Sequence, residues 1–131
     1  MKKHKIGLDI HGVIDKHQEF FKILSHALVD AGHEVHIITG ISETKEVIDE
    51  LTGYGLKWTH FFSITDHHLS IGTEIEYDGQ NRPYMDPHKW DKTKGWYCKE
   101  HGIDMHFDDS NSYHDHFETP YLLMLKKDKN E

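Results

Sequence analysis

The chain has 131 residues, a length typical of a single domain that can bury a core without disulfide bonds. Its 15 basic and 23 acidic residues give a formal net charge of −8, which argues against a broad nucleic-acid-binding surface. The 14 histidines make this charge depend on pH, because imidazoles are about one quarter charged at pH 7 and about three quarters charged at pH 6.

The first half of the chain alternates between strand and helix patterns. Residues 5–10 form a short, mostly apolar run typical of a buried parallel strand. Apolar residues at helical spacing over 20–31 predict a helix that Gly32 ends. Residues 35–39 predict a second strand. Ser42 is the expected N-cap of a second helix that ends at Gly53, and residues 58–64 predict a third strand.

The second half contains a weak region and then two more strands. Asp78-Gly79 is a turn signal between two β-rich segments and predicts a small hairpin insertion at about 70–86. A third helix is expected to begin between Pro87 and Lys92 and to end at Gly102. Strands at 103–107 and 121–125 precede a charged tail, 126–131, that we expect to fray.

The alternation of strands and helices predicts one α/β domain over residues 1–131. The expected architecture is a Rossmann-like three-layer sandwich, in which a parallel sheet lies between two layers of helices. The single cysteine, Cys98, cannot form an intrachain disulfide, which fits a reducing compartment. Asp9 and His11 interrupt the apolar run that a signal peptide would need, and no run approaches the roughly 20 apolar residues of a membrane helix. We therefore expect a soluble cytoplasmic protein with no membrane partner.

Polar residues follow three of the predicted strands, where an open parallel sheet binds its ligands. They are Asp9 with His11, Thr39, and Asp108 with Asp109. Each of these, taken alone, is more common as a turn or capping residue. Together they predict a site, because carboxylates that meet repel one another unless a cation joins them, and oxygen ligands favour Mg²⁺.

A phosphate group is the expected ligand of this cluster. A carboxylate beside Mg²⁺ can attack a phosphoryl group, and the Thr39 hydroxyl and a lysine ammonium can hold the other phosphate oxygens. Gly12 and Gly40 leave room for the backbone to approach the same group closely. The histidine pairs His67-His68 and His114-x-His116 are expected to be surface residues rather than a metal site. The aromatic residues are expected to pack in the core or against helices.

Four segments carry a resemblance to a known family. The segments 8–14 (Leu-Asp-Ile-His-Gly-Val-Ile), 37–40 (Ile-Ile-Thr-Gly), Lys94, and 107–110 (Phe-Asp-Asp-Ser) occur in this order along the chain. They resemble the four motifs of the haloacid dehalogenase-like (HAD) phosphohydrolases, and the resemblance covers about residues 5–125.

The resemblance implies a role for each matching residue. Asp9 would be the nucleophile that becomes an aspartyl-phosphate, and it would also bind Mg²⁺. His11 would bind Mg²⁺ through its backbone carbonyl, and Thr39 would bind the phosphoryl group. Lys94 would neutralise the nucleophile and the phosphate; Lys92, two residues earlier, is the alternative lysine. Asp109 would complete the Mg²⁺ site with Asp108 in support.

His11 departs from the family pattern, because the phosphatases usually have a second Asp there that protonates the leaving oxygen. Histidine can act as a general acid and base near neutral pH. The main expectation is therefore a Mg²⁺-dependent phosphatase. The alternatives are a phosphate- or phosphoprotein-binding protein with little turnover, and an interaction module whose histidine charge controls assembly.

The lengths of the connections bear on the substrate. Neither the segment 9–39 nor the segment 39–94 has room for a full cap domain, so the resemblance is to the small capless type. An open site suits a bulky phosphorylated end, such as a nucleotide, an oligonucleotide or a protein. A partner subunit in a homo-oligomer is another possible lid.

Overall fold

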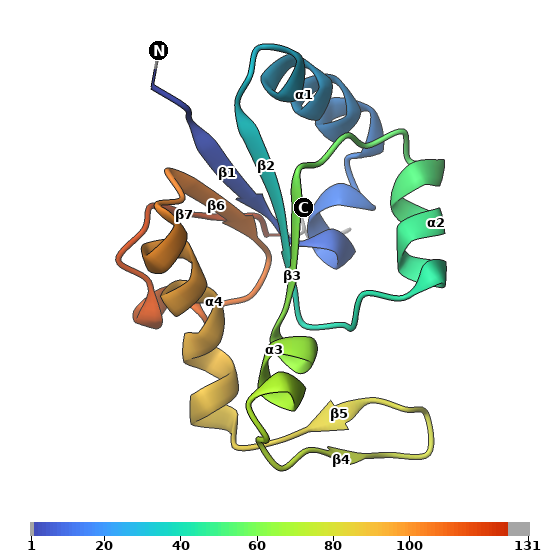
Figure 1. Cartoon of the computed structure of the whole chain (residues 1–131), viewed down its shortest axis with the longest axis vertical. Helices are drawn as coiled ribbons and strands as arrows, with labels where there is room; N and C mark the ends of the chain where they lie inside the picture. Colours follow the sequence, from blue (N-terminus) through green and yellow to red (C-terminus); the bar gives the residue numbers. More distant parts are fainter. Residues whose placement is uncertain (1, 126–131) are drawn as a thin grey trace, which may run out of the picture.

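The computed structural model describes residues 2–125 as an α/β fold built on a parallel five-stranded sheet (Figure 1). The sheet order is β3-β2-β1-β6-β7. The strands are β1 (Lys5–Leu8), β2 (Glu34–Thr39), β3 (His60–Ser63), β6 (Met105–Asp108) and β7 (Tyr121–Leu123). All four pairings between neighbours are parallel, so the carboxyl ends of the strands share one edge of the sheet.

Helices cover both faces of the sheet. Figure 1 shows α1 (Gln18–Asp30) and α2 (Lys45–Gly53) on one side and α4 (Pro87–His101) on the other. Alternation along β2 explains the two layers: Val35 and Ile37 join the core under α1 and α2, whereas Ile38 packs with Tyr97 and Cys98 of α4. The predicted flanked parallel sheet is thus confirmed.

The predicted hairpin is also present. Strands β4 (Glu76–Tyr77) and β5 (Pro83–Tyr84) pair antiparallel around Asp78-Gly79 and extend away from the main sheet (Figure 1). Asp78 holds the turn, since its carboxylate accepts hydrogen bonds from Gln80 N at 2.8 Å and Arg82 N at 2.9 Å.

Several predicted boundaries are wrong. The first strand ends at Leu8, and Ile10–Ile14 forms a compact turn instead of continuing the strand. The N-cap of α2 is Thr44, whose hydroxyl accepts a hydrogen bond from Val47 N at 3.3 Å, and not Ser42. The third strand stops at Ser63, and a helix that was not predicted, α3 (Ile64–Ser70), follows at once. Ser63 caps this helix.

The last elements are shorter than predicted or shifted. The strand expected at 103–107 is β6, which runs to Asp108, and the strand expected at 121–125 is β7, which ends at Leu123. A short 3₁₀ turn, His114–His116, lies between them. Trp96 is 46% exposed, and its ring lies 4.9 Å from the ring of His67. The predicted tail, 126–131, lies outside the described residues. Within residues 2–125, no helix is long and apolar enough to cross a membrane.

Candidate active site

Asp9 is the first residue after β1, the strand that lies between β2 and β6. Its backbone N–H donates to Phe107 O at 3.1 Å, which ties the end of β1 to β6. Its Oδ1 accepts a hydrogen bond from Ile10 N at 2.9 Å, and its side chain is only 14% exposed. Burial raises the pKa of the Asp9 carboxyl to about 6, and Lys94 only partly offsets this effect. The carboxylate is therefore costly to hold charged unless further positive charge is present.

Lys94 supplies the positive charge that is built into the site. Its Nζ lies 2.7 Å from Asp108 Oδ2 and 3.4 Å from Asp9 Oδ2, and its side chain is 1% exposed. Burial alone would lower the pKa of this amine, but the two carboxylates outweigh it and raise the pKa above its ordinary value. The alternative lysine, Lys92, is exposed. The structure thus brings Lys94 rather than Lys92 to the strand ends.

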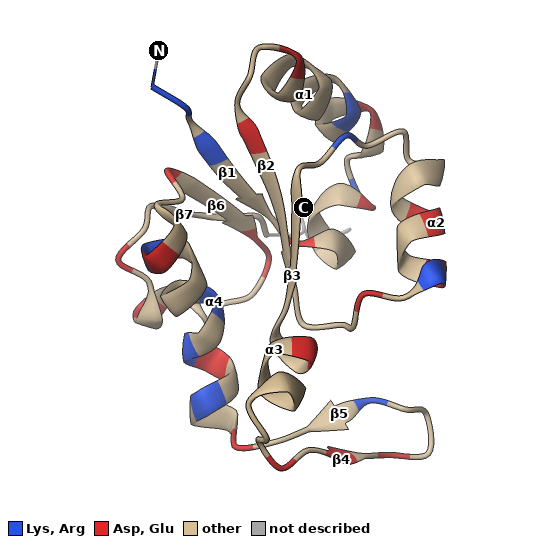
Figure 2. Cartoon of the chain, viewed as in Figure 1, with Lys and Arg blue, Asp and Glu red and all other residues tan. Residues whose placement is uncertain are grey.

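Lys94 lies about two turns from the start of its helix, which was expected to begin between Pro87 and Lys92. The helix does start at Pro87, with Asp86 as its N-cap, yet Lys94 points into the site. Helix α4 lies along the sheet, so its middle passes the strand ends and a long side chain there reaches the carboxylates. Figure 2 shows several basic positions on α4; Lys94 is the buried one of its four lysines.

Two residues that were not predicted complete the surroundings of Lys94. His106 is buried and its Nε2 lies 2.9 Å from Asp108 Oδ2. The ring of Tyr113 lies 4.7 Å from Lys94 Nζ, which is a cation–π contact. His106 and Asp108 are two residues apart on a strand, so their side chains lie on the same face. This spacing could have identified His106 from the sequence. No sequence signal identifies Tyr113, because it comes from the loop after β6.

Asp108 and Asp109 have different roles. Asp108 is fully buried; despite burial, its hydrogen bond with His106 and its ion pair with Lys94 lower the pKa of its carboxyl. Asp109 is exposed and packs against Gly12, whose φ of +90° favours glycine. A Cβ on Gly12 would overlap the Asp109 carboxylate. Gly12 therefore makes room for Asp109 beside the turn that follows Asp9.

Thr39 ends β2 at the same edge of the sheet, and Gly40 follows it. Leu8 pairs with Ile37, so Thr39 lies two residues beyond this pair, next to the turn after β1. The Thr39 hydroxyl is buried and accepts only a long hydrogen bond, 3.4 Å, from Ile41 N. Gly40 packs against Trp90, where a Cβ would come within 2.7 Å of the indole ring. The space that a side chain at Gly40 would need is thus occupied by Trp90.

The side chain of His11 contacts Glu50 of α2. Its side chain is 54% exposed, and its Nε2 lies 3.1 Å from Glu50 Oε2 on α2. Its backbone has φ −80° and ψ 126° within the turn that precedes Gly12. This contact ties the His11 side chain to α2, while its backbone follows Asp9 by two residues.

The acidic cluster fits a divalent cation. One carboxylate oxygen from each of Asp9, Asp108 and Asp109 lies within 4.8 Å of the other two. Three carboxylates against the one ammonium of Lys94 leave a local charge of −2. A hard divalent cation with oxygen ligands compensates this charge, and it removes the cost that raises the pKa of Asp9.

Comparisons with protein-family models, curated proteins and solved structures gave no match.

Proposed function

We propose that this protein is a Mg²⁺-dependent phosphatase that acts through an aspartyl-phosphate at Asp9. The observation that carries the proposal is the buried Lys94 ammonium, which lies 3.4 Å from Asp9 Oδ2 beside two further carboxylates. A cation that is fixed beside a partly exposed carboxylate suits the transfer of a dianionic group, because it neutralises both the nucleophile and the arriving phosphate. The Rossmann-like architecture and the order of the motifs support the HAD-like assignment.

The cation would be held by Asp9, Asp108 and Asp109, with the backbone carbonyl of His11 as a further ligand. When bound, Mg²⁺ would neutralise charge on the phosphoryl oxygens. Asp108 is the least free of the three, because Lys94 and His106 already contact its Oδ2. Asp109 is the more available ligand, since it is exposed whereas Asp108 is fully buried.

The reaction proceeds in two displacements at phosphorus. In the first, an Asp9 oxygen forms a bond to phosphorus while the bond to the ester oxygen breaks. In the second, a water oxygen attacks phosphorus while the water gives a proton to the His11 imidazole, which lost its proton to the leaving oxygen; the bond to Asp9 breaks, and inorganic phosphate leaves. Thr39 would bind the phosphoryl oxygens, and Lys94 would stabilise their charge in both steps. Residues 2–125 contain no cap domain larger than the β4–β5 hairpin, which suits an exposed phosphoester on a nucleotide, an oligonucleotide or a protein.

A second function, phosphate binding with little turnover, is favoured by the contact between His11 and Glu50. The ester oxygen must gain a proton as it leaves, and His11 would supply it only after its ring leaves Glu50. If the ring stays there, the pocket binds phosphate but releases product slowly. Turnover through His11 would therefore require its ring to leave Glu50 and to turn toward the phosphoryl group.

The experiment is phosphate release from an aryl phosphate and a panel of phosphoesters, with and without Mg²⁺. We expect turnover that requires Mg²⁺ and that disappears in Asp9→Asn. Saturable phosphate binding without any turnover across the panel would replace the phosphatase by the phosphate-binding protein. Neither binding nor turnover would overturn both functions. In His11→Asp, a large gain in turnover would identify His11 as a brake, and a loss would identify it as the working acid and base.

A further inference from the structure

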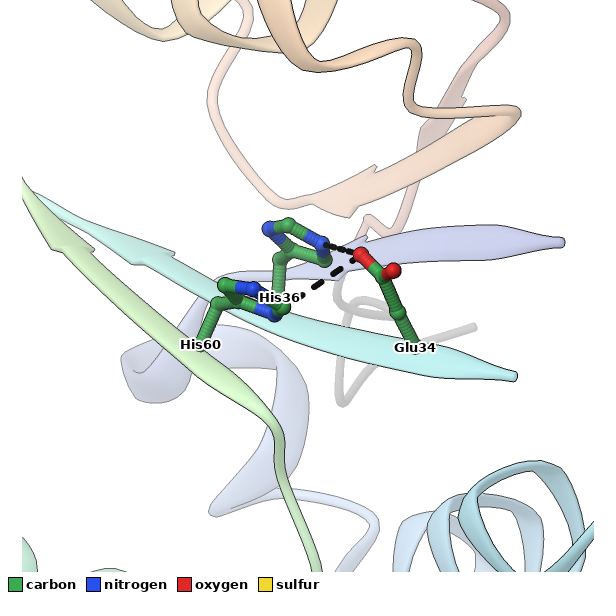
Figure 3. Close-up of side chains that lie close together, drawn as sticks. All are labelled: Glu34, His36 and His60. Atoms are coloured by element: carbon green, nitrogen blue, oxygen red, sulfur yellow. Dashed lines mark hydrogen bonds and ion pairs between the residues drawn. The ribbon is translucent and has the colours of Figure 1, made fainter. Parts of the chain in front are cut away.

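A second group of potential ligands lies on the sheet face that α4 covers. Glu34 and His36 are two residues apart on β2 and therefore point to the same face. The parallel register pairs His36 with His60 of β3, so their side chains are neighbours across the strands. Figure 3 shows the three side chains converging, with both imidazoles directed toward the Glu34 carboxylate. This cluster lies in the amino-terminal half of β2, whereas Thr39 ends the strand at the candidate active site.

The geometry points to a transition-metal site, and we propose that Glu34, His36 and His60 bind one Zn²⁺. His36 Nε2 lies 2.8 Å from Glu34 Oε1, and His60 Nδ1 lies 3.7 Å from the same oxygen. Bonds of about 2.1 Å in a tetrahedral site place neighbouring ligand atoms about 3.4 Å apart, which lies between these two distances. One ligand atom from each residue lies within 4.8 Å of the other two.

The surroundings of His36 resemble the support that a metal-bound histidine has. Its second ring nitrogen, Nδ1, lies 2.7 Å from the Tyr97 hydroxyl, and the side chain is 1% exposed. A metal on Nε2 leaves the proton on Nδ1, which then donates to Tyr97 and fixes the ring. Burial lowers the pKa of His36 despite its hydrogen bond to Glu34.

The His60 ring must change its orientation for both imidazoles to bind one metal ion. The His36 and His60 rings are stacked, with centroids 4.1 Å apart and planes within 6°. A metal lies near the plane of each imidazole that binds it, so one ring must tilt. His60 is on the edge strand β3 and its side chain is 48% exposed, which leaves it free to do so. Solvent on that side supplies the fourth ligand.

The metal would replace the hydrogen bond between His36 and Glu34, and two further contacts compete with it. The Lys3 ammonium lies 3.9 Å from Glu34 Oε2, the oxygen that faces away from His36. Thr59 Oγ1 lies 2.9 Å from His60 Nδ1. Both partners are weak, since Lys3 is largely exposed and the Thr59 hydroxyl also donates to Val35 O. A divalent ion replaces them without breaking the sheet.

The test is Zn²⁺ binding to the full chain by calorimetry and by competition with a chromogenic chelator. We expect one tight equivalent that disappears in His60→Gln and in Glu34→Gln, with at least about a 100-fold loss of affinity, more than the loss of an outer-shell partner costs. Tyr97→Phe should weaken binding by about 10–100-fold, because it removes the acceptor for His36 Nδ1–H. His36 is not the first choice for substitution, since it is buried and its loss risks misfolding.

The controls separate this site from the other histidines and from the acidic cluster. His114→Gln should leave the tight equivalent unchanged, because this exposed histidine lies in another part of the fold. Asp9→Asn should also leave it unchanged. Zn²⁺ bound equally well by His60→Gln and Glu34→Gln, or no tight equivalent in the parent protein, would overturn the proposal. In either case the three residues form an ordinary hydrogen-bonded cluster.

Discussion

Lys94 Nζ lies 2.7 Å from Asp108 Oδ2, and both side chains are almost completely removed from solvent. This ion pair also holds Asp9, at 3.4 Å from the same nitrogen. Removing the ammonium would leave two buried carboxylates without their cation. Breaking a buried pair by removing one partner is far costlier than removing an exposed charge.

Lys94→Met should therefore destabilise the protein by about 3–5 kcal/mol and should abolish phosphate release. Urea denaturation measures the first effect and aryl phosphate turnover the second. Lys92→Met is the matched control, because it removes an exposed lysine from the same helix and should change stability by less than about 0.5 kcal/mol. Equal stability losses in the two variants would contradict the structural role of Lys94.

Asp9→Asn should stabilise the metal-free protein at high pH. Because the pKa of Asp9 rises from 3.8 to about 6 on folding, its carboxyl favours folding while protonated and loses that advantage as pH rises through about 6. The variant should be more stable than the parent at about pH 8, by at most about 3 kcal/mol, and nearly equal at about pH 4.

Denaturation curves at both pH values, with and without Mg²⁺, measure this difference. Saturating Mg²⁺ should reduce the advantage of the variant, since the cation binds the ionised Asp9 of the parent. A variant that is less stable than the metal-free parent at about pH 8 would show that the ion pair with Lys94 outweighs the burial of Asp9.

Gly12→Ala should weaken Mg²⁺ binding, because a Cβ at this position overlaps the Asp109 carboxylate. The positive φ adds about 1–3 kcal/mol of backbone strain. Gly32→Ala is a close control, since Gly32 has φ +91° but no neighbouring atom within 4 Å of the added Cβ. Calorimetry with Mg²⁺ should separate the variants: similar losses of stability, but a loss of affinity only in Gly12→Ala. Unchanged affinity in Gly12→Ala would remove Asp109 from the metal site.

Turnover should respond differently to changes at His11 and at its partner. His11→Ala keeps the backbone carbonyl, so Mg²⁺ affinity should persist while kcat falls by about 10²–10⁴-fold, as expected for loss of a general acid. Glu50→Gln keeps the imidazole and should change kcat by less than about tenfold. If His11→Ala retains full kcat, the proton comes from another group.

Cys98 should be unreactive in the folded protein. It is completely buried, and burial raises the pKa of its thiol to about 12, so almost no thiolate exists at neutral pH. Alkylation by iodoacetamide should be slow in buffer and fast in urea, with one adduct by mass spectrometry. Fast alkylation in buffer would place Cys98 in a region that opens readily.

The sequence predicts the sheet and much of the acidic cluster because both depend on local patterns. The apolar run before Asp9 and the run before Asp108 mark strands whose ends must meet in a parallel sheet. The α3 helix was missed because its seven residues, Ile64–Ser70, are too few to establish a helical period and follow the strand directly.

The features that the sequence did not predict depend on contacts between distant segments of the chain. His36 and His60 come together only through the register between β2 and β3, which no local pattern specifies. The side chain of His11 was expected to act as a general acid and base. It lies in the turn after Asp9, where it contacts Glu50 on α2. Lys94 was identified by its motif, while its path into the site depends on how α4 crosses the sheet.

The position of Lys94 in the middle of α4 makes the site sensitive to the number of residues in the helix. The Asp86 cap and Pro87 fix where α4 begins, and each residue advances the helix by about 100°. One inserted residue between the cap and Lys94 would turn the ammonium toward the sheet's flank or toward water and would leave Asp108 without its cation. The length of this half of the helix is thus itself a part of the site, and we expect insertions to be tolerated in the β4–β5 hairpin long before they are tolerated there.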